Sequence, residues 1–133
     1  MLTGDQSTEQ MIYDRLVALL ESHHEEGSIV IIYEPQSRKF VQFGPGWTLI
    51  MDVPCVALSR DEADRASRFF ANLGVKFPIE YDAPNPKTGR VAHGATFNAD
   101  FEKDARAAAQ ATVGFFREVY LMAGDLKLMF ERR

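Results

Sequence analysis

The chain has 133 residues, a mass of 15.0 kDa and a formal net charge of −4, which fits one domain over residues 1–133. Its 46% hydrophobic and 26% charged residues are ordinary for a globular protein and argue against disorder. The acidic balance, with Arg132–Arg133 as the only basic cluster, argues against a nucleic-acid partner, because phosphate binding requires clustered Lys and Arg.

The sequence also gives no sign of a membrane or secretory signal. No segment approaches the roughly 20 consecutive apolar residues that cross a bilayer. The first ten residues lack the basic and apolar regions of a signal peptide. Because Cys55 is the only cysteine, no intrachain disulfide can form. We therefore expect a cytoplasmic protein without a membrane partner.

A first helix is predicted over residues 5–24. Ser7 and Gln10 have the spacing of a capping box, and Gly27 is suited to end the helix. Apolar residues at helical spacing predict the buried stripe Ile12, Leu16, Leu19 and His23.

Three strands are predicted next, over residues 28–34, 38–43 and 47–53. They are rich in β-branched and aromatic residues and are separated by short turns at 35–37 and 44–46. Such short connections favour an antiparallel meander.

A second helix is predicted from Ser59, which forms a capping box with Glu62, to Gly74. Two strands with period-two alternation follow over 75–81 and 90–97, joined by a long, turn-rich loop. A third helix is predicted from near Asn98 or Asp100 to about Gly124. The tail, 125–133, is compatible with a strand or a short helix.

The predicted order is therefore α-β-β-β-α-β-β-α. Strands that follow one another between helices indicate an α+β fold, with the helices packed on an antiparallel sheet.

The sequence ESHHEEGSIV at 21–30 concentrates histidines and carboxylates. Helical metal ligands usually lie at i and i+4, whereas His23 and His24 point about 100° apart. His23 continues the apolar stripe, so we interpret this cluster as a helix end and predict no metal site.

Other candidate groups have equally plain interpretations. Cys55 could be a nucleophile only with His93 as its base, and no neighbouring basic residue is present to lower its pKa. The segment NPKTGR, 85–90, lacks the order of a phosphate-binding loop and is interpreted as a turn. No pair of carboxylates is placed for acid–base catalysis. The sequence predicts no catalytic residues and no cofactor.

The strands are apolar on both faces, which is unusual for a small sheet with helices on one side. A second apolar face would carry Val30, Ile32, Phe40 and Ile50, and such a patch indicates a partner or dimer surface. The alternative is that the third helix or the tail covers this face.

The order of elements from Ser7 to Ala123 resembles the type III secretion chaperone-like fold, which includes the secretion chaperones and the bacterial sensory transduction regulators. The resemblance implies a homodimer without catalytic residues that binds another polypeptide through its sheet and helix surfaces. We therefore expect a non-enzymatic, chaperone-like or regulatory protein-binding module. Two alternatives are a small-molecule-sensing domain with a pocket near Tyr81 and His93, and an immunity-type protein that binds a toxin.

Overall fold

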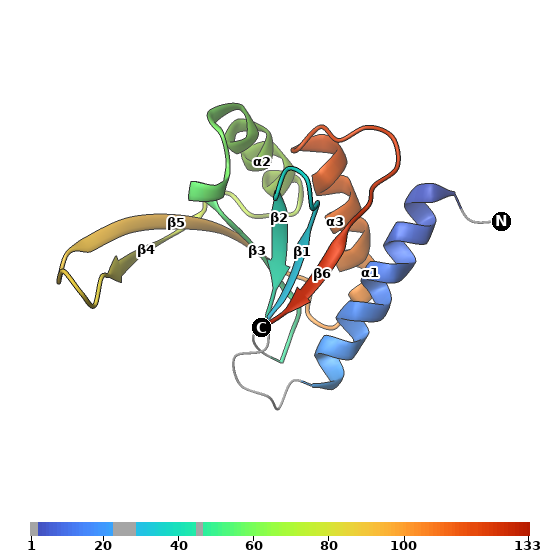
Figure 1. Ribbon diagram of the computed structural model, residues 1–133, viewed down its shortest axis with the longest axis horizontal. Helices are drawn as coiled ribbons and strands as arrows, with labels where there is room; N and C mark the ends of the chain where they lie inside the picture. The colour runs from blue at the N-terminus through green and yellow to red at the C-terminus, as the bar shows by residue number, and fades with distance from the viewer. Residues whose placement is uncertain (1–2, 23–28, 45–46) are drawn as a thin grey trace.

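The computed structural model describes residues 3–22, 29–44 and 47–133. Over these residues the helices and strands follow the predicted order, with one strand added at the end, which confirms the α+β class. In chain order the elements are α1 (Gly4–Glu21), β1 (Val30–Tyr33), β2 (Phe40–Phe43), β3 (Ile50–Pro54), the short 3-10 helix η1 (Cys55–Ala57), α2 (Arg60–Asn72), β4 (Ile79–Pro84), β5 (Val91–Asp100), α3 (Ala105–Glu118) and β6 (Met129–Arg132) (Figure 1).

The strands of the described residues form one antiparallel sheet in the order β4-β5-β3-β2-β1-β6. The tail supplies β6, which pairs with β1 so that Val30 lies opposite Arg132 and Tyr33 opposite Met129. Strand β1 is therefore internal, and β4 and β6 are the two edges of the sheet.

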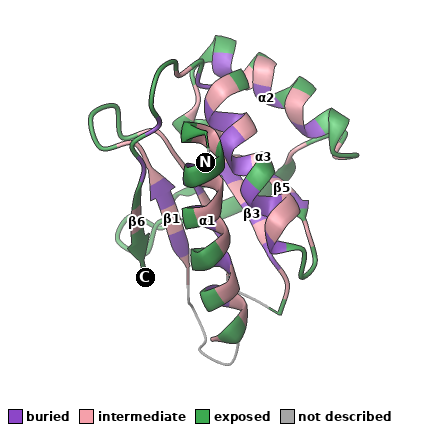
Figure 2. Ribbon diagram, turned by 90° about the vertical axis from the view of Figure 1, so that its right-hand side faces the viewer, coloured by how far each residue is buried: buried purple, intermediate pink, exposed green. Residues whose placement is uncertain are grey.

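The three helices cover one face of this sheet (Figures 1 and 2). Phe70 of α2, for example, stacks on Phe97 of β5 with ring centroids 4.9 Å apart. Because side chains alternate along a strand, every second residue points toward the helices. These buried strand residues are Val30, Ile32, Val41, Phe43, Met51, Val53, Phe97 and Ala99.

The burial of Val30 and Ile32 corrects the predicted partner surface. Both side chains are buried among the helices, with 5% and 0% of their surface exposed, so neither can line an open face. Ile31 and Tyr33 point the other way instead. The predicted alternation of side chains in β1 was shifted by one residue, and such a shift moves every side chain of a strand to the opposite face.

The helix starts differ in how closely they follow the sequence prediction. The capping box predicted at the start of α2 is confirmed. Glu62 N–H donates to Ser59 Oγ at 3.2 Å, and Ser59 N–H donates to Glu62 Oε1 at 2.9 Å. The box at α1 was predicted one turn late, because Thr3 and Gln6 form it in place of Ser7 and Gln10. The predicted helix end at Gly27 lies outside the described residues.

Helix α3 is shorter than predicted at both ends. Asn98 and Asp100 belong to β5, because the alternation of Phe97 and Ala99 toward the core continues the strand. Asp104 caps the helix by accepting the N–H of Ala107. The helix ends at Glu118, so the segment before Gly124 is free to turn toward the sheet.

Arg117 directs the chain from α3 toward β6. Its guanidinium donates to the carbonyls of Met122 and Gly124 at 2.8 and 2.6 Å, and to Asp5 of α1 at 2.6 Å. The hydrogen bond from Arg117 lowers the pKa of the Asp5 carboxyl. After this turn Leu126 and Leu128 are buried in the core. The residues that follow form β6, which pairs with β1.

A second ionic contact joins α2 to the turn before β2. Lys39 Nζ lies 2.6 Å from Glu62 Oε2, and only 7% of the Glu62 side chain is exposed. Burial by itself would raise the pKa of Glu62, but the hydrogen bonds from Lys39 and from the Ser59 backbone outweigh it, so the pKa is lowered.

Glu62 therefore predicts a dependence of stability on pH. A carboxyl whose pKa is lowered by folding stabilises the protein above its unfolded pKa, about 4.3, and this contribution is lost as the pH falls through the lower folded value. We expect Glu62→Gln to reduce the free energy of unfolding at pH 7 and to weaken its decline below pH 4. Urea denaturation at pH 3 to 7 measures this, with the exposed Glu102→Gln as control. Identical pH profiles for wild type and Glu62→Gln would contradict it.

Candidate interaction surface

The face of the sheet opposite the helices is called here the open face, and it carries apolar side chains around a polar row formed by Gln42, Asp52 and Asn98. Its apolar side chains, Ile31, Tyr33, Phe40 and Ile50, are half-buried and lie outside the packed core. Phe40 and Ile50 were predicted at this surface, and Tyr33 pairs directly with Phe40. In the described part of the chain no helix lies on this face (Figure 1).

The polar residues of β2 and β3 could have revealed the correct phase of β1. Gln42 is in phase with Phe40, and Asp52 is in phase with Ile50, so both strands mark their open side with a polar residue. The pairing of β1 with β2 then assigns Tyr33 to the same side.

Asp52 is the centre of a polar cluster on the open face. Its carboxylate accepts hydrogen bonds from Gln42 Nε2 of β2 and from the Thr96 hydroxyl of β5. With its amide nitrogen turned toward β3, Asn98 donates to Asp52 Oδ1 at 2.6 Å. The hydrogen-bond donors of this carboxylate therefore lie on neighbouring strands. Another surface can cover the carboxylate without breaking these hydrogen bonds.

The hairpin formed by β4 and the first half of β5 projects from the body of the molecule (Figure 1). Residues 79–93, called here the arm, are all exposed, including Ile79, Tyr81 and Val91 at 53%, 41% and 56%. The Tyr81 ring lies over Gly94 of β5, where an added Cβ would be 2.5 Å from Tyr81 Cζ. Gly94 therefore lets the ring lie flat on the strand.

The loop at the tip of the arm is a plain turn, as predicted. Asn85 Oδ1 accepts the backbone N–H groups of Lys87 and Thr88, and Gly89 has a φ of +71°. Since two backbone N–H groups of the loop are already bonded to Asn85, they do not form a cradle for phosphate.

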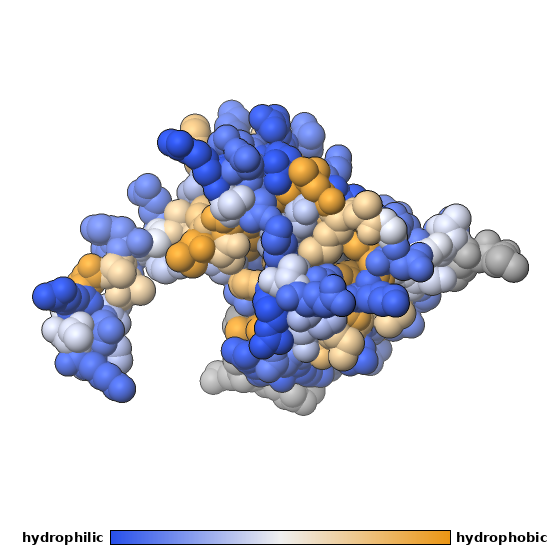
Figure 3. Space-filling view, turned by 45° about the horizontal axis from the view of Figure 1, so that its top comes forward, coloured by the Kyte–Doolittle hydropathy of each residue, from blue (hydrophilic) through white to orange (hydrophobic). Residues whose placement is uncertain are grey.

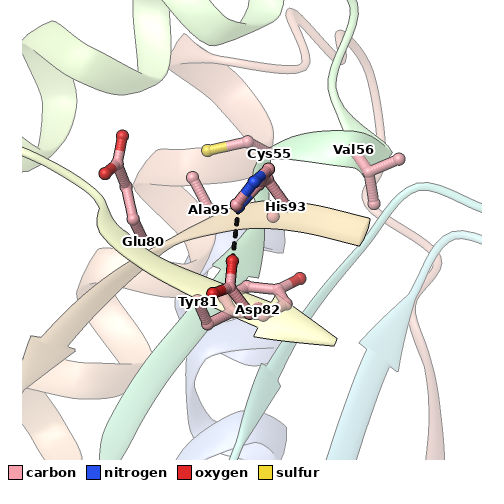
Figure 4. A pocket seen from close by; sticks show the side chains of 8 residues that line it. Cys55, Val56, Glu80, Tyr81, Asp82, His93 and Ala95 are labelled. Atoms are coloured by element: carbon pink, nitrogen blue, oxygen red, sulfur yellow. Dashed lines mark ion pairs between the residues drawn. The ribbon is translucent and has the colours of Figure 1, made fainter. Parts of the chain in front are cut away.

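An open groove of about 800 Å³ lies where the arm meets η1. Tyr81 and His93, predicted near a pocket, both line it, together with Cys55 and Val56 (Figure 4). His93 Nδ1 pairs with Asp82 Oδ1, but the two side chains are 87% and 62% exposed. The groove is therefore open to solvent, and so is the contact between His93 and Asp82, which limits the strength of that contact.

Cys55 is poorly suited to act as a nucleophile in this groove. Burial and the nearby negative charge of Asp52 raise the pKa of its thiol. A nucleophilic cysteine requires the opposite shift, because the thiolate is the reactive form.

No group of three or more His, Cys, Asp or Glu side chains could hold a metal ion within residues 3–22, 29–44 and 47–133. His23 and His24, interpreted as part of a helix end, lie outside those ranges. No helix in the described part of the chain combines the length and apolar character needed to cross a membrane.

Comparisons of the chain with protein-family models, with curated proteins and with solved structures give no match. The resemblance to the type III secretion chaperone-like fold consequently stays a prediction. The open face, the arm and the groove are the features from which a function can be inferred.

From the hydrogen bonds to Asp52 we predict that substitution of this residue lowers the free energy of unfolding. Asp52→Asn turns an amide toward donors on β2 and β5, so we expect the free energy of unfolding to fall by about 1–3 kcal/mol. The control is Glu131→Gln, on the same face but in an exposed pair with Arg133, for which we expect at most about 1 kcal/mol. Urea denaturation measures both, and equal losses would contradict a special role for Asp52.

Proposed function

We propose that the protein is a non-enzymatic protein-binding module, chaperone-like or regulatory, that acts as a homodimer. The observation that carries this proposal is the apolar open face, since the helices pack on the other side of the sheet. Exposed apolar patches on an antiparallel sheet are typical of surfaces that bind other polypeptides.

The chemistry of the open face supports the same function. The apolar side chains lie beside a carboxylate that already has donors on neighbouring strands. A partner can cover such a face with little cost from unpaired polar groups. The raised pKa of the Cys55 thiol and the solvated His93–Asp82 pair favour binding over catalysis.

A substitution on the open face tests this proposal. We expect the wild-type protein to have twice the 15.0 kDa mass of the chain by light scattering. Ile50→Asp places a carboxylate in the proposed dimer interface. We expect the dissociation constant of the dimer to rise at least about 100-fold.

Met11→Asp is the control, because Met11 is 54% exposed and belongs to α1, a helix on the opposite side of the sheet from the open face. Circular dichroism verifies that each variant is folded. A monomeric wild type, or an Ile50→Asp protein that dimerises as tightly as wild type, would contradict the proposal.

The groove at the base of the arm supports a second candidate function, the binding of a small molecule. Tyr81 and His93 provide an aromatic surface and a hydrogen-bonding ring in a space of about 800 Å³. We expect at least one compound of a metabolite library to raise the melting temperature, and Tyr81→Ala to abolish that rise. A library in which no compound changes the melting temperature would count against this function.

A further inference from the structure

The arm adds exposed surface beyond the compact body of the molecule. All of residues 79–93 are exposed, including Ile79, Tyr81 and Val91. A projecting segment of this kind can be covered by a partner, and a standard protein interface takes about 800 Å² from each partner.

The open face continues onto the arm without interruption. Ile79 pairs with Thr96, and Tyr81 pairs with Gly94, so both point to the same side of the sheet as Asp52 and Ile50. The arm bends away from the body, and Figure 3 shows a hollow between the two. The result is a concave surface, called here the clasp surface, whose apolar side chains are Ile31, Tyr33, Phe40, Ile50, Ile79 and Tyr81.

A second hollow lies within the clasp surface, away from the arm. It has a volume of about 290 Å³, and Ile31, Tyr33 and Phe40 are among its lining residues. Arg38 and Arg133 line it as well, and the Arg38 guanidinium lies 5.9 Å from the centre of the Tyr33 ring. An apolar floor with guanidinium groups beside it suits an aromatic side chain, because guanidinium groups stack on aromatic rings.

The free edge of β4 is a poorer place for a partner than the face. A β4 strand paired with its own copy about Tyr81 would bring Glu80 opposite Asp82, and like charges directly opposite are destabilising. Pro84 removes a backbone donor at one end of the strand. Edges of this kind oppose the addition of another strand.

Resting on the proposed homodimer, we propose that two copies of the chain clasp one another through these surfaces. Each arm lies on the open face of the partner, with Ile79 and Tyr81 directed into the partner's 290 Å³ hollow. The arm and the hollow lie on the same face, so both contacts form reciprocally about one two-fold axis and the assembly closes at two subunits. Arg38 and Arg133 line the hollow, and the arm carries Glu80 and Asp82 on either side of Tyr81, so two copies offer each other opposite charges.

Two substitutions on opposite faces of the arm test the clasp. Ile79→Asp removes an apolar contact from the clasp surface, whereas Val91→Asp introduces the same charge on the other face of the arm. We expect the dissociation constant of the dimer, measured by sedimentation, to rise at least about 100-fold for Ile79→Asp and less than about 3-fold for Val91→Asp.

Disulfide cross-linking tests the same geometry without relying on a destabilising charge. In a Cys55→Ser background, Tyr81→Cys and Ile31→Cys chains are mixed and oxidised, and the products are separated without reductant. We expect a cross-linked dimer of the two different chains. A mixture of Tyr81→Cys with Met11→Cys is the control and should stay uncross-linked.

The outcomes separate the clasp from the proposed function. A dimeric wild type with an intact Ile79→Asp dimer and no Tyr81–Ile31 cross-link would overturn the clasp and leave the homodimer in place. A monomeric wild type would overturn both. If Ile79→Asp does not fold, the cross-linking result decides: formation of the cross-link supports the clasp, and its absence overturns it.

Discussion

The structure depends on one geometric constraint, the alternation of side chains along strands that are covered by helices on only one face. Each strand from β1 to β3 carries apolar residues on both faces, but only one set can reach the helices. Val30 and Ile32 are buried in the core, and their neighbours Ile31 and Tyr33 are left on the open face. The stability of the subunit and the apolar character of its outer surface therefore arise from the same strands.

The tail is as important to this arrangement as the helices. Arg117 turns the chain after α3, Leu126 and Leu128 anchor it in the core, and β6 then pairs with β1. Without β6, β1 would be an edge strand with a row of unpaired backbone groups. The tail protects that edge but leaves the open face uncovered, so the alternative in which the tail covers the second face does not apply to the described residues.

The proposed assembly depends on two parts of the surface, the open face and the arm. The open face offers apolar side chains around a hydrogen-bonded Asp52, and the arm presents Ile79 and Tyr81 on the same side at some distance from the core. In the proposed clasp, the arm of one copy occupies the hollow of the other.

The order of the elements, the cap of α2 at Ser59 and the turn at the tip of the arm could be predicted from the sequence, because these features depend on residues a few positions apart. Phe40 and Ile50 could also be assigned to the second face in this way. The phase of β1, the strand in the tail and the extension of β5 through Asn98 became apparent only in the folded chain. The physical reason is that β1 is apolar on both sides, so its pairing with β2 and β6 determines which side is buried.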